Sequence, residues 1–224
     1  MLPALVRRSF RAALDLVAPR LCAGCEAPLA DGDLFCPTCE KSSRKPFDSG
    51  PLEDGTRVVA SGVYDGALGR AIRQLKYRGR TDLARPLGRR LARDVIVMRG
   101  VLSVVFVPVP LHERKLADRG YNQSALVAAE LGAALGLRVA ARALRRCRET
   151  SDQAKLGRLD RLDNVRDAMV GREVLDGKAV ILVDDVVTTG ATALAGVEAL
   201  RRAGAAVVGV AALARAPFFP SRPS

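Results

Sequence analysis

The sequence contains no tryptophan, and aromatic residues make up only 4% of its 224 residues. Proteins that bind single-stranded nucleic acid usually stack bases on aromatic side chains. Any such platform in this chain would therefore have to come from few residues. Histidine is also scarce, because His112 is the only one. A single histidine in a loop is a weak indication of a general base, and we assign it no catalytic role.

Long hydrophobic runs are absent as well, since no stretch approaches the ~20 apolar residues of a membrane span. At the N-terminus, Arg7, Arg8 and Arg11 interrupt what would be the apolar part of a signal peptide, and no convincing cleavage site follows. We therefore expect a soluble, cytoplasmic protein. The spacing of apolar residues in this segment predicts an amphipathic helix that packs on its own domain or lies on a membrane surface. These residues are Leu5, Phe10, Leu14 and Val17.

Acidic residues are outnumbered, with 24 Asp and Glu against 36 Lys and Arg, which gives a net charge of +12. Such a balance favours phosphorylated small molecules or nucleic acid as partners. Charge alone does not choose between them, and a basic overall composition without functional meaning is an equally good explanation. Apolar residues make up 49% of the chain, which is enough for a sizeable core.

Cysteine is used sparingly, but four of the five cysteines fall in two CxxC pairs separated by ten residues. The pairs are Cys22 with Cys25 and Cys36 with Cys39. Each pair can aim two thiolates at one tetrahedral ion, and four thiolates leave no open position, which indicates structural zinc. Two disulfides or a redox pair are the alternatives. They rank below zinc because nothing suggests export and a redox CxxC pair does not require a second CxxC pair close to it. Cys147 stands alone and is expected to be a plain thiol.

A segment rich in Ser, Pro, Gly and charge, residues 41–56, predicts a linker or irregular loop. We therefore divide the chain into residues 1–50, with the N-terminal helix and the zinc module, and residues 51–224, an α/β domain. In the second part, short β-rich runs alternate with helical ones. The expected strands are 56–64, 103–110, 137–144, 179–185 and 205–215, and the expected helices are 66–79, 82–98, 122–136 and 191–204. This alternation predicts a parallel sheet with helices on both faces, which binds ligands at the carboxyl ends of its strands.

The most informative stretch is VILVDDVVTTGAT, residues 180–192, in which a buried strand is expected to lead into a loop and a helix. Backbone N–H groups at the helix start would form an anion site there, with threonine hydroxyls as further donors. The adjacent carboxylates Asp184 and Asp185 suit a vicinal diol or a magnesium ion. A ribose 5-phosphate has both features. A Walker B strand is excluded because GREVLDGKA, residues 171–179, does not fit the required phosphate loop. A plain helix cap leaves the threonines and glycine unexplained.

This stretch resembles the phosphoribosyl-pyrophosphate (PRPP) motif of type I phosphoribosyltransferases. Other stretches resemble the ComF family of competence-associated phosphoribosyltransferase-like proteins, and the resemblance covers essentially the whole chain. They are VPVPLHERKLADRGYNQ (107–123), RRCRETSDQ (145–153) with Asn164, LKYRG (75–79) and the four-cysteine module.

The resemblance implies that Asp184 and Asp185 hold the ribose hydroxyls and help to organise Mg²⁺. It implies a cradle for the 5-phosphate made of Thr188, Thr189, Gly190 and Thr192. Arg114 and Lys115 are candidates for binding pyrophosphate, with a solvated basic loop as the alternative.

Arg119, Asn122 and Gln123 are further candidates for the pocket, although Asn122 would also serve as a helix cap. Residues 145–164 are polar, basic and nearly free of strand character, which favours a loop that closes over the pocket. A surface connector is the alternative.

The function that the resemblance implies is Mg²⁺-dependent transfer of phosphoribosyl from PRPP to a nitrogen nucleophile, associated with competence and DNA uptake. The alternative is a non-catalytic protein that senses PRPP or binds single-stranded DNA during DNA uptake or processing, with single-stranded DNA or DNA-uptake proteins as its partners. The sequence identifies neither the nucleophile nor a general acid or base.

Overall fold

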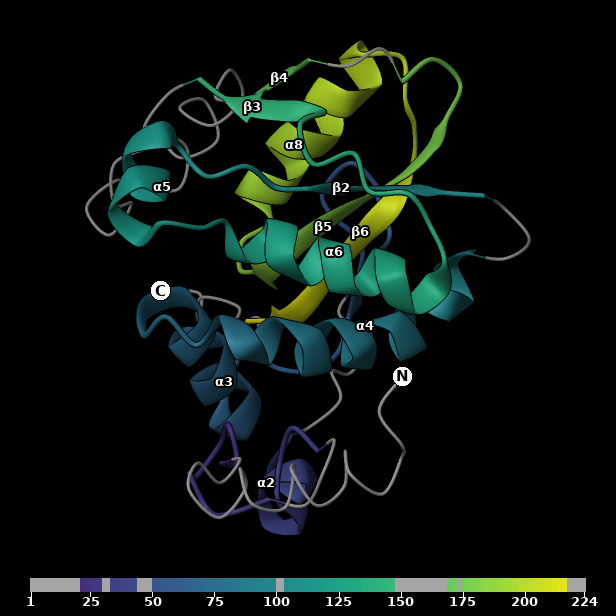
Figure 1. Ribbon diagram of the computed structural model, residues 1–224. Helices are drawn as coiled ribbons and strands as arrows, with labels where there is room; N and C mark the ends of the chain where they lie inside the picture. Colours follow the sequence, from purple (N-terminus) through teal and green to yellow (C-terminus); the bar gives the residue numbers. More distant parts are fainter. Residues whose placement is uncertain are drawn as a thin grey trace, which may run out of the picture.

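The computed structural model describes residues 21–29, 33–43, 50–99, 103–147, 169–172 and 175–216 (Figure 1). The expected N-terminal helix and most of the predicted closing loop lie outside these residues. Within the described ranges, no helix has both the length and the apolar character that crossing a membrane requires.

A four-stranded sheet in the order β1-β6-β5-β2 lies at the centre of the α/β domain, and its neighbouring strands are all parallel. The strands are β1 (Val58–Ala60), β2 (Val105–Pro108), β5 (Ala179–Val187) and β6 (Ala206–Arg215). In β5 every residue from Val180 to Asp185 is buried. Burial on both faces is what an uninterrupted apolar run predicts for an interior strand. The predicted parallel sheet is therefore confirmed.

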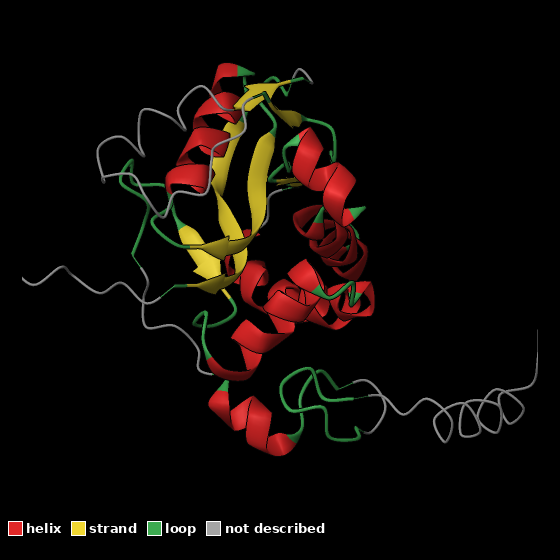
Figure 2. Cartoon of the chain, turned by 90° about the vertical axis from the view of Figure 1, so that its left-hand side faces the viewer, coloured by secondary structure: helices red, strands yellow, loops and turns green. Residues whose placement is uncertain are grey.

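Helices cover both faces of this sheet (Figure 2). On one face lie α3 (Gly66–Tyr77), α4 (Ala84–Arg99) and α6 (Gln123–Leu135), and on the other lies α8 (Ala191–Arg202). Alternate residues of β5 point to opposite faces. Ile181 and Val183 accordingly pack with the first group of helices, whereas Val180 and Leu182 pack with α8. The sequence prediction of a two-sided α/β domain is confirmed.

Local sequence signals place the starts of two of these helices. The side-chain oxygen of Asn122 accepts hydrogen bonds from the backbone N–H groups of Ser124 and Ala125, at 3.0 and 3.3 Å, so it caps α6. Asp65 caps α3 by accepting from the N–H of Gly66 at 2.6 Å. Such caps satisfy N–H groups that have no partner inside the helix. The helix boundary predicted at Asn122 is thus correct.

The strand predicted for residues 137–144 is wrong. Only Val139 of this segment pairs with the edge strand, through a single parallel bridge to Phe106. The chain then turns, because the N–H of Ala143 donates to the carbonyl of Ala140 at 3.2 Å. After this turn the chain leaves the main sheet. The chain continues as β3 (Leu144–Arg146), which pairs antiparallel with β4 (Met169–Gly171) in a separate two-stranded sheet.

Other elements, among them strand β3 and a short helix, were not predicted. Strand β3 occupies the first residues of the segment interpreted as a closing loop, and the rest of that segment after Cys147 lies outside the described residues. The PLHER turn leads into a short helix, α5 (Glu113–Arg119). Its first turn is capped by His112, whose Nδ1 accepts from the N–H of Arg114 at 3.3 Å. The lone histidine therefore has a structural role here.

The described part of the cysteine module, residues 21–29 and 33–43 with α2 (Pro37–Ser42), packs against α3 and α4. Arg70 and Gln74 of α3 donate to the backbone carbonyls of Gly24 and Ala23, at 2.5 and 3.0 Å. Cys22, Ala23, Phe35 and Cys39 belong to the same buried cluster as the helices on this face of the sheet. The division of the chain at residue 50 stays a prediction, since residues 44–49 lie outside the described ranges.

Candidate functional site

A pocket of about 270 Å³ opens where the parallel strands end. Its polar wall is assembled from segments far apart in the sequence. It includes Lys76 of α3, Gln123 and Ser124 of α6, Arg146 of β3, Asp184 and Asp185 of β5, and Thr188 and Thr192 from the loop and helix that follow β5. The predicted position of a ligand site, at the carboxyl end of β5, therefore coincides with a real cavity.

The two carboxylates lie within β5 rather than beyond its end, and both are buried, with Asp184 6% and Asp185 3% exposed. One oxygen of Asp184 accepts from the backbone N–H of Asp185 at 2.8 Å and from the hydroxyl of Ser124 at 3.3 Å. The Oδ2 atom of Asp185 is buried without a hydrogen-bond partner among the described residues. A buried carboxylate oxygen in this state is costly, so it is suited to a cation or a hydroxyl that enters from the pocket.

Burial raises the pKa of Asp184 to about 7, and the nearby charge of Asp185 adds to the shift while Lys76 opposes it. Two adjacent carboxylates in a desolvated site repel each other when both are ionised. Asp184 and Asp185, the acid pair, therefore repel each other when both are ionised, and a bound cation would offset this repulsion.

We expect Asp184→Asn to stabilise the ligand-free protein, and to do so more strongly at pH 8 than at pH 5. The pKa of Asp184 rises from an ordinary 3.8 to about 7 in the folded state, so wild-type stability falls as the pH rises through this window. Asparagine removes that penalty, and its oxygen can still accept from Ser124. The gain at pH 8 should be on the order of 1–4 kcal/mol. Urea unfolding at both pH values measures it, and a difference that does not depend on pH would contradict this reasoning.

Lys76 is a site residue to which the sequence analysis gave no role. Its Nζ lies 2.9 Å from Oδ1 of Asp185, and its side chain is only 16% exposed. Burial lowers the pKa of Lys76, but the charge of Asp185 and the hydrogen bond to it outweigh this effect, so that the pKa is raised. The lysine is therefore charged and paired with the acid pair. The LKYRG stretch supported only the family resemblance, because nothing in its spacing indicated that α3 would point this side chain at β5.

Two of the four residues predicted to cradle the 5-phosphate line the pocket, namely Thr188, which is exposed, and Thr192. Thr189 is exposed outside the described lining, and its hydroxyl accepts from the N–H of Ala191 at 3.5 Å. Gly190 starts α8 with φ of 87°, a left-handed conformation that favours glycine. A Cβ there would also lie 2.8 Å from a methyl group of Leu52. The loop thus requires glycine at this position for two independent reasons.

Of the three candidates in the RGYNQ stretch, Gln123 lines the pocket and is buried, with 5% exposure. Arg119 donates to the side-chain oxygen of Gln123, and its guanidinium lies 5.3 Å from the ring centre of Tyr77. Asn122 caps α6 and donates to the carbonyl of Val109 at 3.0 Å. Arg119 and Asn122 are therefore outside the described lining and bond to residues that form it.

Arg114 and Lys115, the pyrophosphate candidates, lie in the first turn of α5. The pocket is lined by Pro110 and Leu111, just before this helix, and neither basic residue is part of the described lining. Their assignment to pyrophosphate stays a prediction.

Arg146 of β3 is the second residue that the sequence analysis missed, since it was counted only within the predicted closing loop. It lines the pocket beside the acid pair. Burial lowers the pKa of Arg146, and the charge of Asp184 opposes that shift. A partly buried guanidinium beside a ligand cavity is suited to an anionic group.

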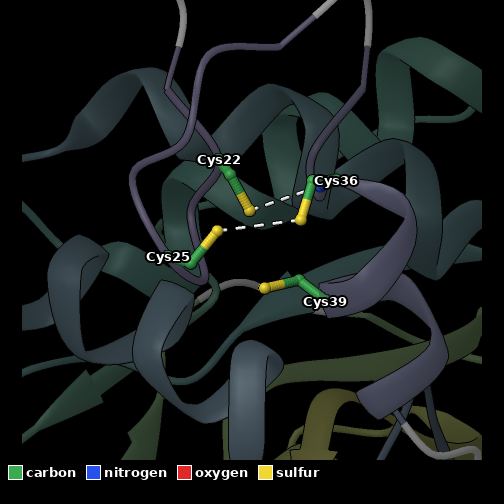
Figure 3. A group of neighbouring side chains, drawn as sticks. All are labelled: Cys22, Cys25, Cys36 and Cys39. Carbon is green, nitrogen blue, oxygen red and sulfur yellow. Dashed lines mark hydrogen bonds between the residues drawn. The ribbon is translucent and has the colours of Figure 1, made fainter.

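The four cysteines of the N-terminal module converge, and their sulfur atoms all lie within 4.8 Å of one another (Figure 3). The sulfurs of Cys25 and Cys36 are 3.7 Å apart. A tetrahedral zinc ion with Zn–S bonds of about 2.3 Å separates its sulfurs by about 3.8 Å. Burial opposes ionisation of Cys22, but backbone N–H groups such as those of Cys36 and Gly24 lower its pKa to about 6. The cluster could therefore bind zinc.

Gly24 is required by this geometry. A Cβ at this position would lie 2.7 Å from the sulfur of Cys39 and 2.8 Å from the Cβ of Ala67 on α3. We expect Gly24→Ala to destabilise the protein by about 1–3 kcal/mol, because the added methyl group pushes the loop of the first cysteine pair away from Cys39 of the second pair and from α3. Chemical denaturation measures the loss, and unchanged stability would contradict the close packing of the module on α3.

The model of the phosphoribosyl transferase domain family matches residues 117–219. The DNA utilization protein YhgH of Escherichia coli O6:H1 is 32% identical, over 89% of this chain and 99% of the relative. Competence protein F of Haemophilus influenzae is 31% identical, over 71% of this chain and 73% of the relative. The chain belongs to the ComF family. The resemblance noted from its motifs is thereby confirmed, and the ComF-family chain carries a phosphoribosyltransferase domain and a four-cysteine cluster.

A solved structure described as the allosteric regulatory enzyme of purine biosynthesis matches with a TM-score of 0.42 and 23% identity. The match covers 63% of the ComF-family chain and 30% of the enzyme. The family assignment depends on the sequence relatives and not on this match.

Proposed function

We propose that this ComF-family chain binds PRPP with Mg²⁺ and transfers its phosphoribosyl group to a nitrogen nucleophile, in association with competence and DNA uptake. The observation that carries the proposal is that the acid pair and the threonines of the loop and helix after β5, Thr188 and Thr192, contribute to one pocket at the carboxyl end of β5. These groups match the diol and the phosphate of ribose 5-phosphate. The printed names of the relatives, which refer to DNA utilization and competence, support the biological association.

The 5-phosphate is assigned to the start of α8. Thr188 and Thr192 face the pocket there, and Gly190 begins the helix without a side chain. The first N–H groups of a helix have no partner within it, and together with the helix dipole they favour an anion. The site therefore offers hydroxyl and backbone donors to the phosphate oxygens.

The ribose hydroxyls and the magnesium ion are assigned to the acid pair. Carboxylate oxygens are the ligands that Mg²⁺ prefers, and the buried Oδ2 of Asp185 needs a partner. When bound, Mg²⁺ would neutralise charge on the pyrophosphate. The residues present thus fit the metal, and their burial excludes competing water.

In the reaction, the bond between C1 of the ribose and pyrophosphate breaks, the ring passes through an oxocarbenium-like state, and a nitrogen nucleophile attacks the opposite face. The chain contributes by holding the two ends of the ribose phosphate, so that the reacting groups are aligned. Arg146 is placed to offset negative charge in the pocket. Catalysis in this scheme is positional and electrostatic.

We also propose that the four cysteines hold a structural zinc ion. Four thiolates close the coordination shell, so no position remains for a reacting water. By holding the cysteine loops, the zinc would keep the carbonyls of Ala23 and Gly24 in place to accept hydrogen bonds from Gln74 and Arg70 of α3.

Calorimetric titration with PRPP, with and without Mg²⁺, tests the binding step. We expect Mg²⁺-dependent binding, followed by pyrophosphate release when a suitable nucleobase is added. A panel of nucleobases and a coupled pyrophosphate assay identify the acceptor. No binding of PRPP under either condition would refute the proposal.

The second candidate function is a non-catalytic protein that senses PRPP or binds single-stranded DNA. The net charge of +12 is compatible with binding to nucleic acid in this function. Salt-dependent affinity for DNA, together with PRPP binding but no pyrophosphate release with any nucleobase, would select it.

A further inference from the structure

We propose that Lys76 is the internal counter-cation of the acid pair and competes with divalent cations for Asp185. Lys76 would then set the concentration of free cation at which the site becomes loaded. This inference rests on the proposed function, since the carboxylate that Lys76 occupies is the one assigned to Mg²⁺ and the ribose hydroxyls.

The geometry divides the two oxygens of Asp185 between different partners. Oδ1 accepts the ammonium of Lys76 at 2.9 Å, while the buried Oδ2 has no hydrogen-bond partner among the described residues. Both residues line the pocket. An incoming cation therefore meets a carboxylate with one buried oxygen that has no hydrogen-bond partner among the described residues and another that Lys76 already neutralises.

A divalent cation and the lysine cannot share this carboxylate without repelling each other. Magnesium binds carboxylate oxygen at about 2.0–2.1 Å and manganese prefers the same oxygen ligands, so either would come within a few ångströms of the ammonium. The side chains of Lys76 and Asp185 are only 16% and 5% exposed. Solvent therefore screens the repulsion weakly, and its effect on cation affinity is large.

The backbone that carries Lys76 is fixed, so any release of the ammonium must come from the side chain. Two residues before Lys76, Gln74 donates to the carbonyl of Ala23 in the cysteine module at 3.0 Å. One residue before Lys76, the carbonyl of Leu75 accepts from the hydroxyl of Tyr121 at 2.5 Å. The flexible four-carbon stem of lysine permits the ammonium to move away while α3 stays in place. Lys76 thus has the anchoring and the freedom that an exchangeable counter-cation needs.

Manganese titration followed by electron paramagnetic resonance tests the inference without PRPP, using the purified full chain with its cysteine module metal-loaded. We expect Lys76→Met and Lys76→Gln each to bind Mn²⁺ at least tenfold more tightly than the wild type. Lys76→Arg, which keeps the charge, should show no such gain. Lys178→Met is the matched control, because Lys178 is an exposed lysine just before the amino end of β5. The gain should vanish when Asp185→Asn is added to Lys76→Met.

A purely structural role for Lys76 predicts the opposite, namely unchanged or weaker Mn²⁺ binding in folded neutral variants, and that result would overturn the inference. A gain that survives Asp185→Asn would overturn it too, because the cation would then lie elsewhere. The glutamine variant keeps a hydrogen-bond donor for Asp185 and serves as the folded test if the methionine variant unfolds. Failure of PRPP binding together with the Mn²⁺ gain would refute the proposed function alone. PRPP binding without the gain would refute only the role of Lys76.

Discussion

Asp185→Asn is expected to lower the affinity for PRPP at least a hundredfold while the protein stays folded. Asparagine has the same shape but lacks the charge that attracts a magnesium ion, and its amide nitrogen cannot accept from a ribose hydroxyl. Each lost charge-assisted hydrogen bond contributes about 1.5–3 kcal/mol, so the loss of two such contacts exceeds a hundredfold. Calorimetric titration with Mg²⁺ and PRPP measures the change.

The stability of this variant should change little, because two effects oppose each other. Lys76 loses the charge of its partner at 2.9 Å, but Asp184 loses the repulsion of its neighbour. Asp176→Asn is a suitable control, since Asp176 is an exposed carboxylate on the turn that precedes the amino end of β5, opposite the pocket. Retained PRPP affinity in folded Asp185→Asn would show that the acid pair does not hold the ligand.

The parts of the fold that sequence analysis predicted are those specified by local physics. The apolar run Val180–Val183 gives a strand buried on both faces, and Asn122 gives a helix start, because burial and capping act over a few residues. The strand predicted for 137–144 failed for a non-local reason. Its apolar residues do pack, but only Val139 finds a partner on β2, and the turn at Ala140–Ala143 directs the chain into another sheet.

In the candidate site too, the residues set by local sequence could be predicted and those set by packing between distant segments could not. The acid pair and the threonine loop could be predicted because they are continuous in sequence, and a loop between strand and helix places them together. Lys76 and Arg146 could not, since each reaches the pocket from a separate element whose packing on β5 the sequence does not display. Asn122 and Arg119 were assigned to the pocket, whereas they lie outside its described lining and their polar atoms bond to Val109 and Gln123, which line it. Residue type indicated a polar role for them but could not distinguish lining from support.

Removal of the zinc is expected to have the largest effect on stability. A chelator should extract about one zinc ion per chain, and Cys39→Ser should prevent its retention. Structural zinc sites with four thiolates bind with apparent free energies of about 10–16 kcal/mol in isolated peptides, so their loss unfolds what they hold. Cys39 is 6% exposed and belongs to the cluster that includes α3 and α4, so the damage should extend beyond the module. Metal analysis and thermal unfolding measure both effects.

Cys147→Ser provides the matched control, because Cys147 is exposed and lies outside the four-cysteine cluster. It should keep the zinc and the wild-type melting temperature. Hydrogen exchange adds a local readout in the chelated protein. Amides of α3 should exchange faster, because Arg70 and Gln74 of this helix are anchored on the carbonyls of Gly24 and Ala23. If protein purified under reducing conditions contains no zinc, the metal assignment is refuted. Zinc loss with unchanged exchange in α3 would instead show that the module folds independently of the helix that carries Lys76.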